Sequence, residues 1–189
     1  FYNPSAITTG GTNLYVADTV NHKIRKIVIS TGAVTTLAGS SSGFADATGT
    51  SAKFNDPREL TTDGTNLYVS DKINHKIRKI VISSGVVTTL AGSGSAGSAD
   101  GTGTSAKFKN PIGITSDGTN LYVADTLNNT IRKIVISTGV VTTLAGSGPQ
   151  GSTDGTGTSA SFYYPGGIAS YGTNLYVADT FNTNIRKID

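Results

Sequence analysis

Short apolar runs alternate with Gly, Ser and Thr along the whole chain, and one arrangement of them returns four times at almost equal spacing. The string NLYV begins at Asn13, Asn66, Asn120 and Asn174. The string IRKI follows it each time, beginning at Ile24, Ile77, Ile131 and Ile185. Self-similarity at a fixed period of this length indicates a repeat architecture. We therefore expect four copies of one unit, at approximately residues 1–53, 54–107, 108–161 and 162–189, the last of them partial.

One unit predicts four short strands joined by turns. In residues 108–161 the expected strands are Ile112–Thr115, Asn120–Ala124, Thr130–Ser137 and Val140–Ala145. The Asp117-Gly118 pair between the first two is typical of a tight hairpin. The Gly/Ser/Thr-rich residues 146–159 then lead to the next unit. Each unit is thus expected to form one small antiparallel sheet.

The third strand of the unit is not amphipathic, because Ile134, Val135 and Ile136 are apolar in succession. A sheet with one wet face would alternate, whereas a sheet covered on both faces tolerates such a run. Four-stranded sheets that stack face to face and recur at this spacing describe a β-propeller. A β-solenoid fits less well because its repeats are shorter. The fold class expected is therefore all-β, a propeller of four-stranded antiparallel blades.

Composition supports this class and excludes several others. Gly, Ser and Thr make up 73 of 189 residues and charged residues only 14%, which suits neither a disordered nor a helical chain. Cys is absent, which excludes disulfides and Cys-based zinc sites. The net charge of +3 is too small for a dedicated nucleic-acid arm. The longest aliphatic runs, such as residues 27–29, are too short to span a membrane.

The fourth unit stops after its third strand, so fifteen strands are expected where four full blades need sixteen. The chain also has no methionine. Both observations favour a fragment of a longer propeller, or a chain that assembles, over a closed four-bladed monomer. Two four-bladed chains forming one eight-bladed ring would be such an assembly.

When the four units are aligned, each aligned position forms a column of four residues. Three columns hold the same residue type in every unit, which points to a structural role. The Asp and Asn residues are expected to cap a corner by hydrogen-bonding local backbone. The Arg residues are expected to pair with carboxylates or carbonyls of their own or a neighbouring blade. The competing hypothesis is a ring of charges around a ligand. The columns are Asp18, Asp71, Asp125 and Asp179; Asn21, Asn74, Asn128 and Asn182; and Arg25, Arg78, Arg132 and Arg186.

The columns that vary between units supply the candidate ligand-binding residues. Arg58 and Glu59 stand where the other units have small or apolar residues, on the strand that would line the central channel. A local ion pair at a strand end is the competing interpretation. Lys72 replaces a Thr, and Tyr171 replaces the Asp of the Asp-Gly turn. The apolar column Val20, Ile73, Leu127 and Phe181 is expected to pack between blades.

The unit P-x-G-I-x-x-D-G-T-N-L-Y-V-A-D-T-x-N-x-x-I-R-K-I closely resembles the NHL repeat. The triplet at its corner reads Asn21-His22-Lys23 and Asn74-His75-Lys76 in the first two units. The resemblance covers essentially the whole chain. It implies a propeller, usually of six blades, and the inter-unit string L-A-G-S-G…D-G-T-G-T-S-A-x-F resembles that of secreted or cell-envelope bacterial proteins. It implies no single activity, since the family includes enzymes and binding modules.

Enzyme chemistry finds little support. The resemblance to the NHL family includes lyases that use several histidines around zinc. This chain has only His22 and His75, which occupy equivalent positions in adjacent units and are too few for a full zinc site. Lactonase-like propellers hold calcium with unlike acidic and amide groups, and the inner strands here supply only Glu59. Residues 100–103 and 154–157 lack the alternating oxygen ligands of a calcium loop. No catalytic set, metal or cofactor is therefore expected.

The function expected is a non-catalytic scaffold or binding module for a protein or a glycan, outside the cell or in its envelope. Nearly identical blades suit repeated, avid contacts better than one unique active site. The alternatives are a lyase-like or lactonase-like propeller enzyme, or an RNA-binding NHL domain, with key residues outside this segment. The balance of charges and the lack of Trp for base stacking argue against nucleic acid.

Overall fold

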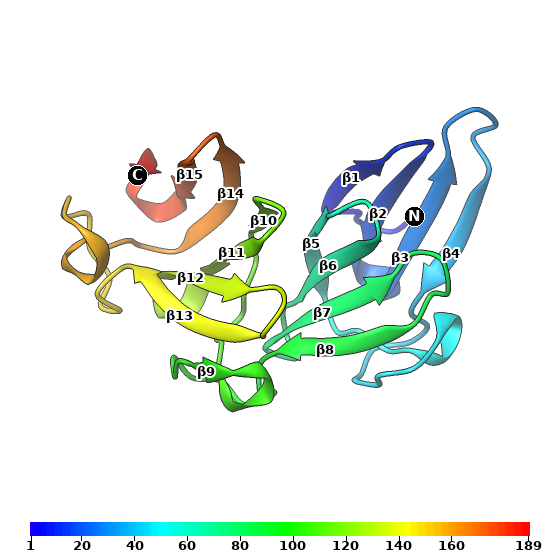
Figure 1. Cartoon of the computed structure of the whole chain (residues 1–189), viewed down its shortest axis with the longest axis horizontal. Helices are drawn as coiled ribbons and strands as arrows, with labels where there is room; N and C mark the ends of the chain where they lie inside the picture. The colour runs from blue at the N-terminus through cyan, green and yellow to red at the C-terminus, as the bar shows by residue number, and fades with distance from the viewer.

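The computed structural model describes residues 1–189 as four antiparallel sheets that follow one another along an open arc (Figure 1). We call the sheets blades 1 to 4. Blade 1 contains β1 (Ala6–Gly10), β2 (Asn13–Asp18), β3 (Lys23–Val28) and β4 (Val34–Ala38). Blade 2 contains β5 (Pro57–Thr62), β6 (Asn66–Asp71), β7 (Lys76–Val81) and β8 (Val87–Ala91).

Blades 3 and 4 differ from the first two in strand number. Blade 3 contains β10 (Ile114–Ser116), β11 (Asn120–Asp125), β12 (Thr130–Val135) and β13 (Val140–Ala145), with β9 (Gly101–Thr102) added at its outer edge. Blade 4 has only β14 (Pro165–Tyr171), β15 (Asn174–Asp179) and β16 (Asn184–Ile188). The predicted all-β propeller, with a last blade that lacks its outer strand, is thus confirmed.

The predicted count of fifteen strands is wrong by one because the inter-blade loop also pairs. The loop that leaves blade 2 runs along the outer edge of blade 3, where β9 pairs with β13. The loop that leaves blade 1 makes a single bridge to blade 2, between Thr48 and Val86. A Gly/Ser/Thr segment carries no hydrophobic periodicity, so the sequence did not reveal this edge pairing.

The helical segments are single 3-10 turns of three residues, and none could cross a membrane. Three of them form the corner between the second and third strands of a blade: η1 (Thr19–Asn21), η4 (Thr126–Asn128) and η6 (Thr180–Asn182). The other three lie in the inter-blade loops: η2 (Gly49–Ser51), η3 (Gly103–Ser105) and η5 (Gly157–Ser159).

The hydrophobic core consists of three clusters, one at each interface between blades. Between blades 1 and 2, Tyr15 and Ile24 of one sheet pack with Leu67 and Val69 of the next, and all are buried. Each cluster includes one Phe from the incoming loop: Phe54, Phe108 or Phe162. Because blades 2 and 3 are covered on both faces, their central strands can be apolar without alternation.

The apolar corner column does not lie within these clusters. Val20, Ile73, Leu127 and Phe181 are between 38% and 55% exposed. The prediction that this column packs between blades is therefore wrong. These residues sit on the corner turns, where the backbone makes a long-range hydrogen bond, and Phe181 also stacks on the ring of Tyr164 within the same unit. For example, the Leu127 amide donates to the Lys109 carbonyl at 3.1 Å.

Candidate binding site in the central channel

The repeated Asp and Arg side chains join a blade to the loop that enters it by hydrogen bonds and ion pairs. In blade 3 the Asp125 carboxylate accepts hydrogen bonds from the Lys109 amide at 2.7 Å, the Asn128 side chain at 2.7 Å and Arg132 Nη1 at 2.8 Å. Arg132 also donates to Asp100 of the incoming loop at 2.7 Å. These bonds join corner, strand and loop inside the protein, away from any shared ligand face.

The same contacts recur in blades 2 and 4, and they are looser in blade 1. Arg78 bonds Asp71 at 2.7 Å, and Arg186 bonds Asp179 at 3.1 Å. In blade 1 the closest approach of Arg25 to Asp18 is 3.9 Å, and the Arg25 side chain is 24% exposed. The geometry in blades 2 to 4 is that of a structural network and not of a charged ring around a ligand.

The side chains of the two histidines also hydrogen-bond to the loop that enters the next blade. His22 Nδ1 accepts a hydrogen bond from the Asp56 amide at 3.2 Å, and His75 Nδ1 accepts one from the Asn110 amide at 3.1 Å. Asn129 does the same with its side-chain oxygen, which accepts from the Tyr164 amide at 2.9 Å. Burial lowers the pKa of His75, in keeping with a neutral acceptor. No group of three or more His, Cys, Asp or Glu side chains could hold a metal ion.

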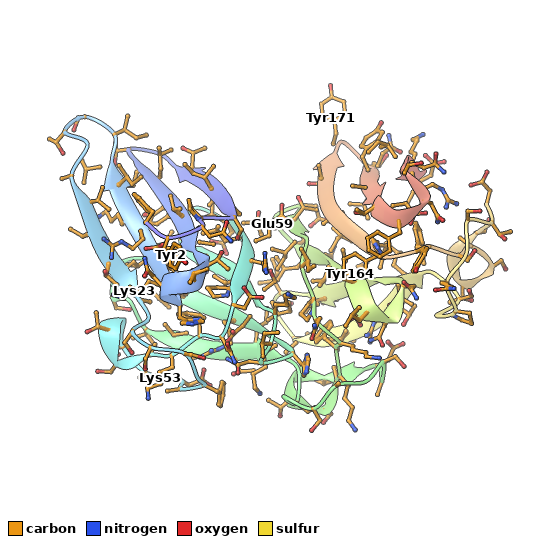
Figure 2. All side chains as sticks on the ribbon, turned by 180° about the vertical axis from the view of Figure 1, so that it is seen from behind. Tyr2, Lys23, Lys53, Glu59, Tyr164 and Tyr171 are labelled. Atoms are coloured by element: carbon orange, nitrogen blue, oxygen red, sulfur yellow. The ribbon has the colours of Figure 1, made fainter.

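A cavity of about 480 Å³ lies where the inner strands of the blades converge. All four blades contribute to it, and Glu59 is the one carboxylate in its wall. Figure 2 shows Glu59 between the half of the arc with blades 1 and 2 and the half with blades 3 and 4. The lining residues are Ser5, Ala6, Ile7, Arg58, Glu59, Ile112 and Gly167.

The Glu59 carboxyl is expected to change its charge near neutral pH. Burial raises its pKa to about 7, and the smaller opposing effect comes from the Ile114 amide, which donates to Oε2 at 3.3 Å. A carboxyl in this state can donate a hydrogen bond when protonated and accept when ionised. It is therefore the most chemically versatile group in the channel.

Ser70 fixes the strand that carries Glu59, and the sequence analysis missed it. The Glu59 amide donates to Ser70 Oγ at 2.9 Å, and Ser70 Oγ donates to the Ile112 carbonyl of blade 3 at 2.6 Å. The corresponding residues of the other units are Ala17, Ala124 and Ala178. That single departure from NLYVAD was the signal that could have revealed it.

Arg58 and Lys72 meet at Asp56, another residue that the sequence analysis missed. Asp56 Oδ2 lies 3.0 Å from Arg58 Nη2 and 2.9 Å from Lys72 Nζ. In blades 1 and 3 the residue in the Lys72 column is a Thr whose hydroxyl donates to a proline carbonyl of the next blade at 2.8 Å. The side chains of Arg58 and Lys72 are thus held in an ion cluster at the start of β5.

Tyr171 lies apart from the other candidates. It is exposed at the tip of the β14–β15 hairpin, and Figure 2 shows it projecting from the end of blade 4. The equivalent Asp63 and Asp117 accept hydrogen bonds from the hydroxyls of Tyr68 and Tyr122, at 2.7 and 2.8 Å. The structure therefore brings Arg58, Glu59 and Lys72 together on blade 2 and leaves Tyr171 outside that group.

Known proteins resemble the chain in its repeats. It is 35% identical over 159 residues to human NHL repeat-containing protein 2, an alignment covering 78% of this chain and 21% of the relative. It is also 35% identical over 153 residues to protein SUPPRESSOR OF QUENCHING 1, chloroplastic, from Arabidopsis thaliana, covering 74% of this chain and 14% of that protein. The chain thus spans about a fifth or less of the length of these relatives. No protein-family model matches it.

Solved structures share the arrangement of blades. A Bacteroides thetaiotaomicron protein of unknown function superposes with a TM-score of 0.81 at 26% identity, covering 97% of this chain and 46% of that one. An auxiliary nutrient binding protein from the same organism gives 0.79 at 21% identity, covering 97% and 47%. Virginiamycin B lyase from Staphylococcus aureus gives 0.61 at 18% identity, covering 98% and 55%. At identities as low as those of the last two, the likeness shows the fold alone. The repeats and the blades together make this chain an NHL-repeat β-propeller.

Proposed function

We propose that the chain is a non-catalytic binding propeller whose ligand occupies the central cavity and contacts Glu59. The observation that carries this proposal is the cavity itself. Its volume of about 480 Å³ lies within the range of small-ligand sites, and it combines small and apolar residues with Arg58 and Glu59. Such an arrangement orients a ligand by a few polar contacts.

The chemistry of the wall favours a ligand with hydroxyl groups, of which a glycan is the best match. Glu59 can accept from or donate to a hydroxyl, and Ile112 offers apolar contact to its C–H groups. The structural likeness to an auxiliary nutrient binding protein supports a binding role of this kind. As part of this proposal, the protein acts outside the cell or in the cell envelope.

The positions of the other reactive groups support a binding role without catalysis. Each histidine is held as an acceptor in its own blade corner. The repeated Asp and Arg side chains are already engaged in hydrogen bonds between blades and loops. Glu59 therefore has no histidine and no second carboxylate beside it in the cavity wall.

An oligosaccharide microarray, followed by titration of the wild-type protein with each hit, tests the proposal. Binding should move the amide resonances of Glu59 and Ile114, and Glu59→Gln should weaken it about tenfold. Tyr171→Ala is the control and should leave affinity unchanged, because Tyr171 lies outside the cavity. Cleavage of a bound oligosaccharide, or equal binding by the Glu59→Gln variant, would contradict the proposal.

We also infer that two copies associate through the end faces of the arc. Ile7 on blade 1 is 60% exposed and Ile185 on blade 4 is 72% exposed, although the other members of their two columns are buried. Those others are Leu60, Ile114 and Ile168 in one column and Ile24, Ile77 and Ile131 in the other. Inside the chain these columns pack at the interfaces between blades, so the two end faces are complementary.

Light scattering at increasing protein concentration tests this association. The wild-type protein should show twice the mass of one chain, and Ile185→Asp should return it to one chain with no loss of secondary structure by circular dichroism. A single-chain mass at every concentration would refute the association.

A further inference from the structure

Three aromatic side chains meet at the corner of blade 4, and we call them the corner aromatic cluster. The Tyr164 ring stacks on Phe181, with centroids 4.5 Å apart and planes 10° from parallel. Tyr163 meets Phe181 edge-on, at 5.0 Å and 88°. The two tyrosines lead into β14 and Phe181 lies in η6, so the entering loop and the corner turn of one blade build the cluster together. Figure 2 shows Tyr164 at the opposite end of β14 from Tyr171.

Blades 2 and 3 form the same corner without any aromatic residue at these three positions. Their corner turns still reach the entering loop through the backbone, as the Phe181 amide does when it donates to the Tyr163 carbonyl at 3.1 Å. The fold of the corner therefore does not depend on aromatic rings. The counterparts of the cluster are Asn55, Asp56 and Ile73 in blade 2, and Lys109, Asn110 and Leu127 in blade 3.

Tyr164 occupies a backbone position that disfavours a tyrosine. Its φ is +58°, in the left-handed region, directly before Pro165. Asp56 and Asn110 adopt nearly the same conformation, with φ of +60° and +51°. Asn and Asp enter this region at less cost than a bulky side chain, so the tyrosine carries strain that its counterparts largely avoid. Strain of this kind concentrates where a side chain is needed for function.

The cluster is accessible from solvent, and its accessibility does not depend on where blade 4 lies in the row of blades. Phe181 is 55% exposed. Ile73 and Leu127 each have a blade on either side, and they are still 42% and 38% exposed. Tyr164 lies between two described blades, because its amide donates to the Asn129 side chain of blade 3 at 2.9 Å. The corner position thus faces outward in the middle of the arc as well.

The surroundings of the cluster are neutral. Each of the other Phe rings in the chain lies against an Arg or Lys cation, 4.5 to 5.8 Å from the ring centroid, whereas Phe181 packs against the two tyrosines. The Asp179 carboxylate, which accepts from the Tyr163 amide at 2.7 Å, is fully buried and paired with Arg186 at 3.1 Å. The accessible polar groups are therefore the phenol hydroxyls and the Asn182 side chain next to Phe181.

We propose that the corner aromatic cluster is a saccharide-binding site that stacks a sugar ring of a neutral, β-linked oligosaccharide. A pyranose with equatorial substituents presents a flat face of C–H groups, which the negative face of an aromatic ring attracts. Hydroxyls at the edge of the sugar can then bond the phenol and amide groups beside the rings, which both donate and accept.

The geometry favours a sugar over two other ligands of aromatic surfaces. Proline-rich peptides dock into grooves between aromatic side chains, whereas the Tyr164 and Phe181 rings are stacked in contact and leave no groove between them. Single-stranded nucleic acid needs cations for its phosphates beside the stacking rings, and the groups around this cluster are neutral. None of the cluster residues borders the central cavity, so this site is separate from the proposed channel site.

Titration with cellohexaose and with xylohexaose, followed by NMR, tests the proposal. Saturable shifts should appear at the resonances of Tyr163, Tyr164 and Phe181, and the affinity should not depend on salt concentration. Phe181→Leu places the side chain of the blade 3 corner in blade 4 and should weaken binding about tenfold, because the stacking ring is lost. Ile73→Ala is the matched control at the corner of blade 2 and should leave the affinity unchanged.

Tyr164→Asn separates a binding role from a folding role. The variant has the residue of Asn110 at this position, which suits the left-handed conformation. We expect it to weaken saccharide binding about tenfold without lowering the melting temperature. A lower melting temperature together with unchanged binding would show that the ring serves folding, and it would overturn the proposal.

Three other results would also overturn the proposal. They are the absence of saturable binding by both oligosaccharides, equal binding by Phe181→Leu, and shifts confined to residues outside the cluster. A decaproline peptide is titrated in parallel, and its binding at these rings in place of the sugars would assign the surface to a proline-rich protein partner. Glu59→Gln should leave the shifts at the cluster unchanged, so failure of the channel proposal remains distinguishable.

Discussion

Replacing Asp125 by alanine should destabilise the protein by about 4 kcal/mol. The Asp125 and Arg132 side chains are both fully buried and lie 2.8 Å apart. Removing one partner of a buried ion pair costs about 3–5 kcal/mol, because the remaining charge stays out of water. The Lys109 amide also loses its 2.7 Å acceptor. Arg132 keeps its bonds to Asp100 and the Lys107 carbonyl, which holds the loss below the upper end of that range.

The repeat supplies a matched comparison in Asp18→Ala. Asp18 occupies the same column, but Arg25 approaches it only to 3.9 Å and is partly exposed to solvent. This substitution removes the acceptor of the Tyr2 amide and of Asn21, without stranding a buried guanidinium. We expect a loss of about 1–2 kcal/mol, well below that of Asp125→Ala.

Urea unfolding followed by circular dichroism measures the difference. With a slope of about 2 kcal/mol/M, the midpoint should fall by roughly 2 M for Asp125→Ala and by less than about 1 M for Asp18→Ala. An unchanged midpoint for Asp125→Ala would refute the structural role of the column. Equal shifts for the two variants would refute the reasoning from burial.

Two further predictions concern the channel acid and the inter-blade glycines. Because burial raises the pKa of Glu59 to about 7, the folded protein holds this proton more tightly than the unfolded chain, so stability should fall as pH rises from about 4.5 to 7. Glu59→Gln should remove the contribution of this carboxyl, so that stability falls less steeply over this range, and an identical profile of melting temperature against pH in the variant would contradict the prediction. Gly92→Ala should destabilise by about 3 kcal/mol, because φ is +103° and the new Cβ would lie 2.5 Å from the His75 carbonyl oxygen. Gly64→Ala, with φ of +88° and open space around it, should cost only about 1 kcal/mol in urea unfolding, and equal losses would show that the close contact is unimportant.

The sequence by itself determined the blades. Each unit carries its strands and turns in one short stretch of chain, and hydrophobic spacing with Asp-Gly and Gly turns fixes such local pairing. The expected strand Val140–Ala145 agrees with β13, and the expected Asn120–Ala124 agrees with β11 to within one residue. Repetition multiplied that signal fourfold, and the apolar run at Ile134 correctly indicated a sheet covered on both faces.

Only the tertiary structure decided which residues meet across the blades. Arg132 and Asp100 are 32 residues apart and their pairing depends on the path of a loop without hydrophobic periodicity. The place of Glu59 in the cavity depends on how four inner strands converge, and the contact of Ser70 with blade 3 depends on the same convergence. The sequence of one repeat determines the hydrogen bonds within its own sheet. The stacking of one repeat on the next determines which side chains are buried. Burial in turn decides which charged side chains hold blades and loops together and which remain accessible to a ligand.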